Sequence, residues 1–131
     1  MDGRPLAGIK LYMRKKIYYL STCSTCARIL GEIDAEANGF TLQDIKTEKI
    51  SPAQLDEMKE AAGSYAALFS RRAIKYKELG LKDEVLTEKD YRRLILEEYT
   101  FLKRPVALLG KRIFAGSEKK TVEELKAALR G

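Results

Sequence analysis

The sequence contains no histidine and no tryptophan, and only two of its 131 residues are cysteine. Without histidine, the Cys–His and Ser–His pairs of many nucleophilic enzymes are excluded. Any reactive cysteine must then be activated by arginine, lysine or a helix N-terminus. A structural zinc site usually needs four Cys or His ligands, so a single chain with two cysteines does not supply one. We therefore expect no bound metal and no bound cofactor.

Long apolar runs are also missing. No segment approaches the roughly 18 to 20 apolar residues that a membrane-spanning helix needs, and the N-terminus lacks the apolar stretch and cleavage site of a secretory signal. We therefore expect a cytoplasmic protein with no membrane partner. In that compartment thiols are mostly reduced, so a cysteine pair is more often catalytic or redox-sensing than structural.

The formal net charge of +6 is unevenly distributed. Residues 1–15 hold four basic side chains and one acidic side chain, which is half of the excess. We expect residues 1–15 to be an extension, either flexible or leading into the first strand, and residues 16–130 to form one globular domain. The bulk charge therefore gives little reason to expect direct binding of nucleic acid.

Two basic clusters lie within the expected domain. The first contains Arg71, Arg72, Lys75 and Lys77, and the second contains Lys103, Arg104, Lys111 and Arg112. Clusters of this kind are usually solvated surface, and they can also form a site for an anion. Both interpretations stay open at this point.

The two cysteines stand close together, directly after an apolar run. Cys23 and Cys26 form a Cys-x-x-Cys motif that follows the strand-like residues 16–20. A helical pattern begins at the second cysteine, so we expect the first sulfur at a helix N-terminus, where free N–H groups and the helix dipole favour a thiolate. Such a thiolate can attack a disulfide and be released when the second thiol closes an intramolecular bond. The alternative is a pair of structural cysteines, because free cysteine is commonly a small buried hydrophobic residue.

Apolar periodicity predicts a β-α-β unit at the start of the domain. We expect strands at about 16–20 and 40–45, and between them a helix at about 24–37 that ends at Gly39. The apolar face of this helix is expected to contain Ala27, Leu30, Ile33 and Ala37. The usual right-handed crossover makes the two strands a parallel pair.

The segment at about 51–103 contains no convincing strand and is predicted to be a helical insertion. Ser51 opens a helix with a capping box and a proline at the first helical position, and Thr87 caps a longer helix. Shorter helices are expected at about 64–69 and 76–80.

Strand patterns return after the insertion. Residues 105–109 and 112–115 predict a hairpin, and residues 121–124 are expected to cap a final helix. Together these elements predict an α/β fold with a four-stranded mixed sheet, in the order β-α-β, helical insertion, β-β-α.

Three pieces of the sequence together carry a resemblance to a known family. They are residues 18–26, which contain the Cys-x-x-Cys motif, then Ser70-Arg71-Arg72 followed by residues 76–81, and Arg104-Pro105-Val106 at the third strand. Over about residues 16–129 the sequence resembles the ArsC/Spx family of arsenate reductase-like proteins, closest to its Cys-x-x-Cys branch. The resemblance implies a thioredoxin-like fold.

The resemblance also implies roles for individual residues. Cys23 corresponds to the reductase nucleophile of the family, and Cys26 would be the resolving thiol. Arg104 matches the arginine that faces the cysteine and holds an anionic substrate, and Pro105 resembles the cis-proline of thioredoxin-like folds. A second anion-binding arginine would be Arg72, with Arg71 as the alternative. An arginine-proline pair can also simply begin a strand.

One departure from the family pattern bears on the substrate. Arsenate reductases carry a third arginine just after the last hairpin strand, where this sequence has Ala115-Gly116-Ser117. Losing one charged hydrogen bond costs about 1.5 to 3 kcal/mol, which is a large loss for an arsenate dianion. The sequence therefore favours a substrate other than arsenate.

Two functions are compatible with these features. The first is a thiol-disulfide oxidoreductase that acts on a small oxyanion or a disulfide, with glutathione/glutaredoxin or thioredoxin as electron donor. The second is a redox-sensing regulator resembling Spx, which binds the C-terminal domain of the RNA polymerase alpha subunit. Spx-like regulators carry a glycine at that contact, and Gly63 is the nearest candidate here.

Overall fold

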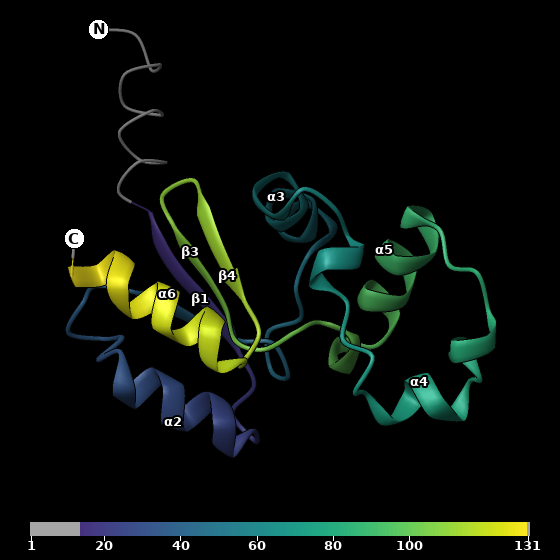
Figure 1. Cartoon of the computed structure of the whole chain (residues 1–131), viewed down its shortest axis with the longest axis horizontal. Helices are drawn as coiled ribbons and strands as arrows, with labels where there is room; N and C mark the ends of the chain where they lie inside the picture. Colours follow the sequence, from purple (N-terminus) through teal and green to yellow (C-terminus); the bar gives the residue numbers. More distant parts are fainter. Residues whose placement is uncertain (1–13, 131) are drawn as a thin grey trace, which may run out of the picture.

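A four-stranded mixed sheet forms the centre of the protein in the computed structural model, which describes residues 14–130 (Figure 1). Its strands are β1 (Lys15–Tyr19), β2 (Thr41–Asp44), β3 (Val106–Leu109) and β4 (Arg112–Ala115), in the spatial order β2-β1-β3-β4. β1 and β2 are parallel, whereas β1 with β3 and β3 with β4 are antiparallel. This confirms the predicted α/β fold and its mixed sheet.

Two helices, α2 (Ser24–Glu32) and α6 (Lys119–Arg130), cover one face of the sheet (Figure 1). Their inward side chains meet the sheet in one core cluster. Its buried members are Ile17, Ile29, Ile33, Ala35, Phe40, Ala107, Phe114, Val122 and Leu125. This cluster anchors α2, and therefore fixes where the Cys-x-x-Cys motif begins.

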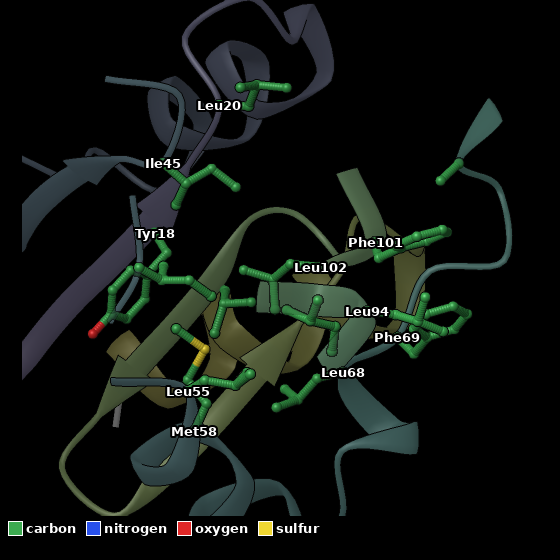
Figure 2. Packing of buried hydrophobic residues seen from close by; sticks show 14 of the residues in the cluster. Tyr18, Leu20, Ile45, Leu55, Met58, Leu68, Phe69, Leu94, Phe101 and Leu102 are labelled. Atoms are coloured by element: carbon green, nitrogen blue, oxygen red, sulfur yellow. The ribbon is translucent and has the colours of Figure 1, made fainter. Parts of the chain in front are cut away.

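The other face of the sheet packs against α3 (Pro52–Ala62) and the helical segments that follow it. Figure 2 shows this larger cluster, in which Tyr18 and Ile45 come from the sheet side and Leu55 and Met58 come from α3. The helix begins as predicted, because Ser51 accepts a hydrogen bond from the backbone of the third helical residue and completes a capping box.

The helical insertion lies between β2 and β3 in the sequence and projects to one side of the sheet (Figure 1). After α3 it consists of η1 (Ala66–Leu68), α4 (Ile74–Glu78), η2 (Leu81–Asp83), α5 (Glu88–Glu97) and η3 (Tyr99–Phe101). Thr87 caps α5 as predicted, and it forms a capping box with Asp90 that the sequence analysis did not predict. Within residues 14–130 no helix is long and apolar enough to cross a membrane.

A short backbone ladder joins the segment after η1 to the end of the insertion. Phe69 and Leu102 form an antiparallel bridge. The Ser70 N–H donates to the Phe101 carbonyl at 2.7 Å, and the Lys103 N–H donates to the Leu68 carbonyl at 2.8 Å. The rings of Phe69 and Phe101 stack, with centroids 4.9 Å apart. Segments about 30 residues apart in sequence therefore lie side by side.

An ion pair joins α3 to α5. Arg92 donates to both carboxylate oxygens of Asp56, from Nε at 2.8 Å and from Nη2 at 3.2 Å, and the Tyr65 hydroxyl donates to Asp56 at 2.6 Å. The hydrogen bonds from Arg92 and Tyr65 lower the pKa of Asp56 to about 2. This network fixes the start of η1, which forms part of the wall described below.

The helix expected at 24–37 is shorter than predicted, and its buried face is as expected only in part. It ends at Glu32, because Asp34 takes a left-handed conformation with φ 53° and starts a turn. Of the expected face members, Ile33 is buried and Leu30 packs against the core, whereas Ala27 and Ala37 are exposed. The helix buries Cys26 and Ile29, and the sequence pattern did not assign Cys26 to the core.

The final helix begins earlier than predicted. It starts at Lys119, and the Val122 N–H already donates to the Glu118 carbonyl at 3.0 Å, so Thr121 lies inside the helix and does not cap it. The segment expected as a short helix at 64–69 is a single turn of 3-10 helix. The predicted strands agree with the observed ones to within a residue at each end.

The expectation for residues 1–15 falls mostly outside the described residues. Of that segment, Lys15 begins β1, and the Arg14 side chain pairs with Glu57 of α3. The remaining residues of the expected extension are not part of the described structure.

Candidate functional site

Cys23 occupies the N-cap position of α2. Its φ of −97° and ψ of 111° are extended, and its carbonyl accepts the first helical hydrogen bond, from the Ala27 N–H at 3.1 Å. The loop that leads to it is held from two sides. The Cys23 N–H donates to the Leu20 carbonyl at 3.0 Å, and the Asp44 carboxylate accepts from the Ser21 N–H at 3.2 Å. The strand and the helix together therefore fix the sulfur at the helix N-terminus.

The pKa of the Cys23 thiol is lowered from its ordinary value. Burial would raise it, and three other influences outweigh burial. The nearby backbone N–H groups of Cys26 and Thr25, the Cys26 thiol and the positive charge of Arg104 all favour the thiolate and lower its pKa. The sulfur therefore lies where a helix terminus and an arginine both act on it.

Cys26 lies one turn further along α2 and is fully buried. Burial, together with the neighbouring Cys23 sulfur, raises the pKa of its thiol to about 11. Both cysteines are free thiols in this structure. The pair therefore consists of one partly exposed sulfur that ionises readily and one buried sulfur that keeps its proton.

Cys23 opens into a cavity of about 350 Å³. Four cationic side chains line it, namely Arg71, Arg72, Lys103 and Arg104, and Glu118 is its single carboxylate. Among the described residues, none of these four cations forms a salt bridge. A cavity with several unpaired cations around a thiolate is suited to an anionic ligand.

Arg104 is the cation tied most directly to the sulfur. Its Nη1 atom is buried and has no hydrogen-bond partner within residues 14–130, while its charge acts on Cys23. The peptide bond to Pro105 is cis, as the resemblance implied. Pro105 itself is buried and does not line the cavity, and its carbonyl accepts a hydrogen bond from the Gly116 N–H at 2.9 Å.

Arg72 and Arg71 were the alternatives for the second anion-binding arginine, and both line the cavity in the structure. The guanidinium of Arg71 donates to the Tyr91 hydroxyl at 3.3 Å, which holds it toward α5. Arg72 has no side-chain hydrogen bond within the described chain and is exposed at the cavity rim. Both guanidinium groups are therefore available to one ligand.

Sequence reasoning missed Lys103 and Glu118 as members of the site. The sequence analysis placed Lys103 in one basic cluster with Arg104, Lys111 and Arg112. Of these four residues, only Lys103 and Arg104 line the cavity. Lys111 lies at the far end of the β3–β4 hairpin and lines a separate cavity of about 260 Å³, and Arg112 stacks over the Phe114 ring. The available signal for Lys103 was its position next to Arg104. Within residues 14–130 no group of three or more His, Cys, Asp or Glu side chains could hold a metal ion.

Solved structures of similar fold support the architecture. An arsenate reductase from Vibrio cholerae is 20% identical, covers 86% of this chain and 97% of its own, and superposes with a TM-score of 0.71. An ArsC family related protein from Bacteroides fragilis is 21% identical, with 86% and 99% covered and a TM-score of 0.72. A possible arsenate reductase from Streptococcus mutans is 25% identical, with 86% and 98% covered and a TM-score of 0.69.

The sequence comparison extends the likeness beyond the fold. The family model described as ArsC family matches residues 18–125, which include both cysteines and all four cations of the cavity. No curated protein sequence matches the chain. At the level of the family, the arsenate reductase-like fold supports a thiol oxidoreductase. The chain therefore belongs to the ArsC family.

Proposed function

We propose that the protein is a cytoplasmic thiol-disulfide oxidoreductase in which Cys23 is the nucleophile and Cys26 the resolving thiol. The observation that carries this proposal is the opposite perturbation of the two thiols. The pKa of Cys23 is lowered at a helix N-terminus, and burial raises the pKa of its neighbour Cys26 to about 11. Attack on a substrate requires a thiolate, which the lowered pKa of Cys23 favours. The raised pKa of Cys26 delays the second attack, because that thiol keeps its proton.

In the first step the Cys23 thiolate attacks one sulfur of a substrate disulfide. A bond forms between the Cys23 sulfur and the attacked sulfur, the substrate S–S bond breaks, and its electron pair leaves on the departing thiolate. Arg71, Arg72 and Arg104 line the cavity into which the substrate must enter. Their charges favour an anionic substrate and also the thiolate itself.

In the second step Cys26 resolves the mixed disulfide. Formation of that disulfide removes the negative charge on the Cys23 sulfur, which is one of the influences that raise the pKa of Cys26. Cys26 then loses its proton more easily and attacks the Cys23 sulfur, and the remaining substrate arm leaves as a thiolate. The substrate gains two electrons, and the protein holds an oxidised Cys23–Cys26 pair.

The oxidised pair must be reduced by an external thiol. Glutathione together with glutaredoxin, or thioredoxin, is the proposed electron donor, and no bound cofactor is needed for either. Arsenate is the less favoured substrate, because the segment after β4 carries Ala115-Gly116-Ser117 in place of a third arginine.

A turnover assay with matched variants tests the proposal. The substrate is the mixed disulfide of glutathione and 2-mercaptoethanol, arsenate is assayed in parallel, and each is supplied with glutathione/glutaredoxin or with thioredoxin. We expect Cys23→Ser to abolish turnover and Cys26→Ser to trap a mixed disulfide on Cys23 that mass spectrometry detects. Full turnover by Cys23→Ser with either donor would refute the assignment of the nucleophile.

The alternative function is a redox-sensing regulator that binds the C-terminal domain of the RNA polymerase alpha subunit. The same cysteine pair would serve as its sensor. Gly63, the candidate glycine of that contact, ends α3 in a left-handed conformation with φ 93°. Its presence is thus explained by helix termination. Capture of the isolated alpha domain by the oxidised protein, and no turnover of disulfides, would favour the regulator.

A further inference from the structure

Lys103 is held beside the segment that follows β4. Its backbone N–H donates to the Leu68 carbonyl at 2.8 Å, so the residue is fixed where the insertion returns to the sheet. A Cβ atom built on Gly116 would lie 3.7 Å from Lys103 Cδ and 3.9 Å from Lys103 Cβ. The aliphatic part of Lys103 therefore packs along the backbone at Gly116, which has a φ of 103° that residues with a side chain rarely adopt.

This placement brings the charge of Lys103 to the cavity beside Gly116. Lys103 and Gly116 line the same cavity as Cys23, and Lys103 forms no salt bridge among the described residues. The neighbouring Gly116-Ser117 lies where the family pattern has a third arginine and this sequence has none. Lys103 packs beside this segment and contributes an ammonium group to the cavity.

An ammonium and a guanidinium recognise different anions. A guanidinium presents a planar fork of donors that binds two oxygens at once, whereas an ammonium is a compact point charge on a flexible stem. A single carboxylate on a flexible arm is satisfied by a point charge. A tetrahedral oxyanion that is contacted on several sides is bound more strongly by bidentate guanidinium groups.

We propose that Lys103 is a specificity-determining residue that selects, for attack by Cys23, disulfides whose arm carries a carboxylate. This inference rests on the proposed function for its substrate class. The carboxylate of the arm lies against Lys103 while the Cys23 sulfur bonds to the near sulfur of the disulfide. The S–S bond breaks, and its electron pair leaves on the far thiolate.

The first test needs no redox chemistry. Cys23 is alkylated with iodoacetate, which is anionic, and with iodoacetamide, which is neutral, and the ratio of the two rate constants is measured. Because both reagents react with the same thiolate, the ratio cancels any change in the pKa of Cys23. We expect Lys103→Gln to lower the iodoacetate-to-iodoacetamide ratio on the order of threefold, the effect of one nearby charge in a solvated cavity.

Two matched variants complete this test. Lys103→Arg retains the charge and should retain most of the ratio. Lys111→Gln removes the same charge from the whole protein at the far end of the hairpin, outside this cavity, and should leave the ratio unchanged. An unchanged ratio in Lys103→Gln, or an equal fall in Lys111→Gln, overturns the proposal.

The second test addresses the substrate class. The rate of attack by Cys23 is measured in a Cys26→Ser background on 3,3′-dithiodipropionate, which carries two carboxylates, and on neutral 2-hydroxyethyl disulfide. We expect Lys103→Gln to lower the ratio of the two rates about as much as the alkylation ratio. An unchanged disulfide ratio overturns the substrate class. If neither disulfide reacts while the alkylation ratio still falls, the proposed function is refuted and Lys103 stands as an anion-recognition residue.

Discussion

Replacing Arg104 by methionine should raise the pKa of Cys23. Methionine keeps a similar length and unbranched shape but removes the charge that stabilises the thiolate. Both residues line the same cavity, and the charge of Arg104 is the weakest of the influences that lower the pKa of Cys23. Two unit charges on the order of 10 Å apart interact by about 0.4 to 1.7 kcal/mol for effective dielectric constants from about 80 to about 20. Because one pKa unit corresponds to about 1.4 kcal/mol, we expect the pKa to rise by about one unit at most.

The assay is the pH dependence of Cys23 alkylation by iodoacetamide in a Cys26→Ser background. The thiolate is the reacting form, so a group with a higher pKa loses reactivity at a higher pH, and the midpoint of the profile should move upward in Arg104→Met. Arg104→Lys separates charge from geometry. It should leave the midpoint close to that of the parent, since the positive charge remains.

The geometry of the Arg104 side chain should instead affect the turnover rate. Lysine lacks the bidentate fork, so Arg104→Lys should lower the rate with an anionic disulfide about tenfold, which corresponds to about 1.4 kcal/mol of transition-state stabilisation. Its free energy of unfolding should stay within about 1 kcal/mol of the parent. An unchanged alkylation midpoint in Arg104→Met, together with unchanged turnover in Arg104→Lys, would remove Arg104 from the site.

Three further predictions concern the cysteine pair, a helix end and an ion pair. Mild oxidation should join Cys23 to Cys26 within one chain with little change in circular dichroism, and purely intermolecular dimers on mass spectrometry would contradict this. Gly63→Ala should destabilise the fold by about 1 kcal/mol in urea, because its φ is 93°, whereas Gly31→Ala, inside α2 with open space around it, should be neutral or stabilising. The pKa of Asp56 is lowered from 3.8 to about 2, so its ion pair stabilises the fold above about pH 4 and this contribution disappears as pH falls toward about 2. Asp56→Asn should therefore be less stable than the parent at pH 7, and a stability difference that persists unchanged at pH 2 would refute this assignment.

The features that were predicted from the sequence are those that depend on interactions between neighbouring residues. The capping box at Ser51 and the helix cap at Thr87 depend on residues close together in the sequence, and both are observed. The sheet strands followed from apolar alternation, and the position of Cys23 before a helix followed from the strand that precedes it. Each of these features is set by neighbours in the sequence.

The features that could not be predicted from the sequence depend on contacts between residues that are far apart in the chain. The turn at Asp34 ends α2 early because the chain must return to the sheet with Ala35 and Phe40 buried. The cavity membership of Lys103 depends on the bridge between Phe69 and Leu102, which pairs segments about 30 residues apart in the sequence. A pattern of neighbouring residues cannot predict a bridge of this kind. For the same reason the sequence left Arg71 and Arg72 as alternatives, whereas both reach the cavity.

The position of the cations along the chain has a consequence for how this protein can be re-engineered. All four cations of the cavity fall between residues 64 and 104, a segment that contains none of the sheet strands, whereas Cys23 and Cys26 sit on the first β-α-β unit. Three of these cations, Arg71, Arg72 and Lys103, lie apart in sequence from the thiols, whereas Arg104 also lowers the pKa of Cys23. Chimeras that exchange residues 64–103 with those of a relative and keep Arg104 should transfer the choice of substrate and retain the thiol reactivity of this protein.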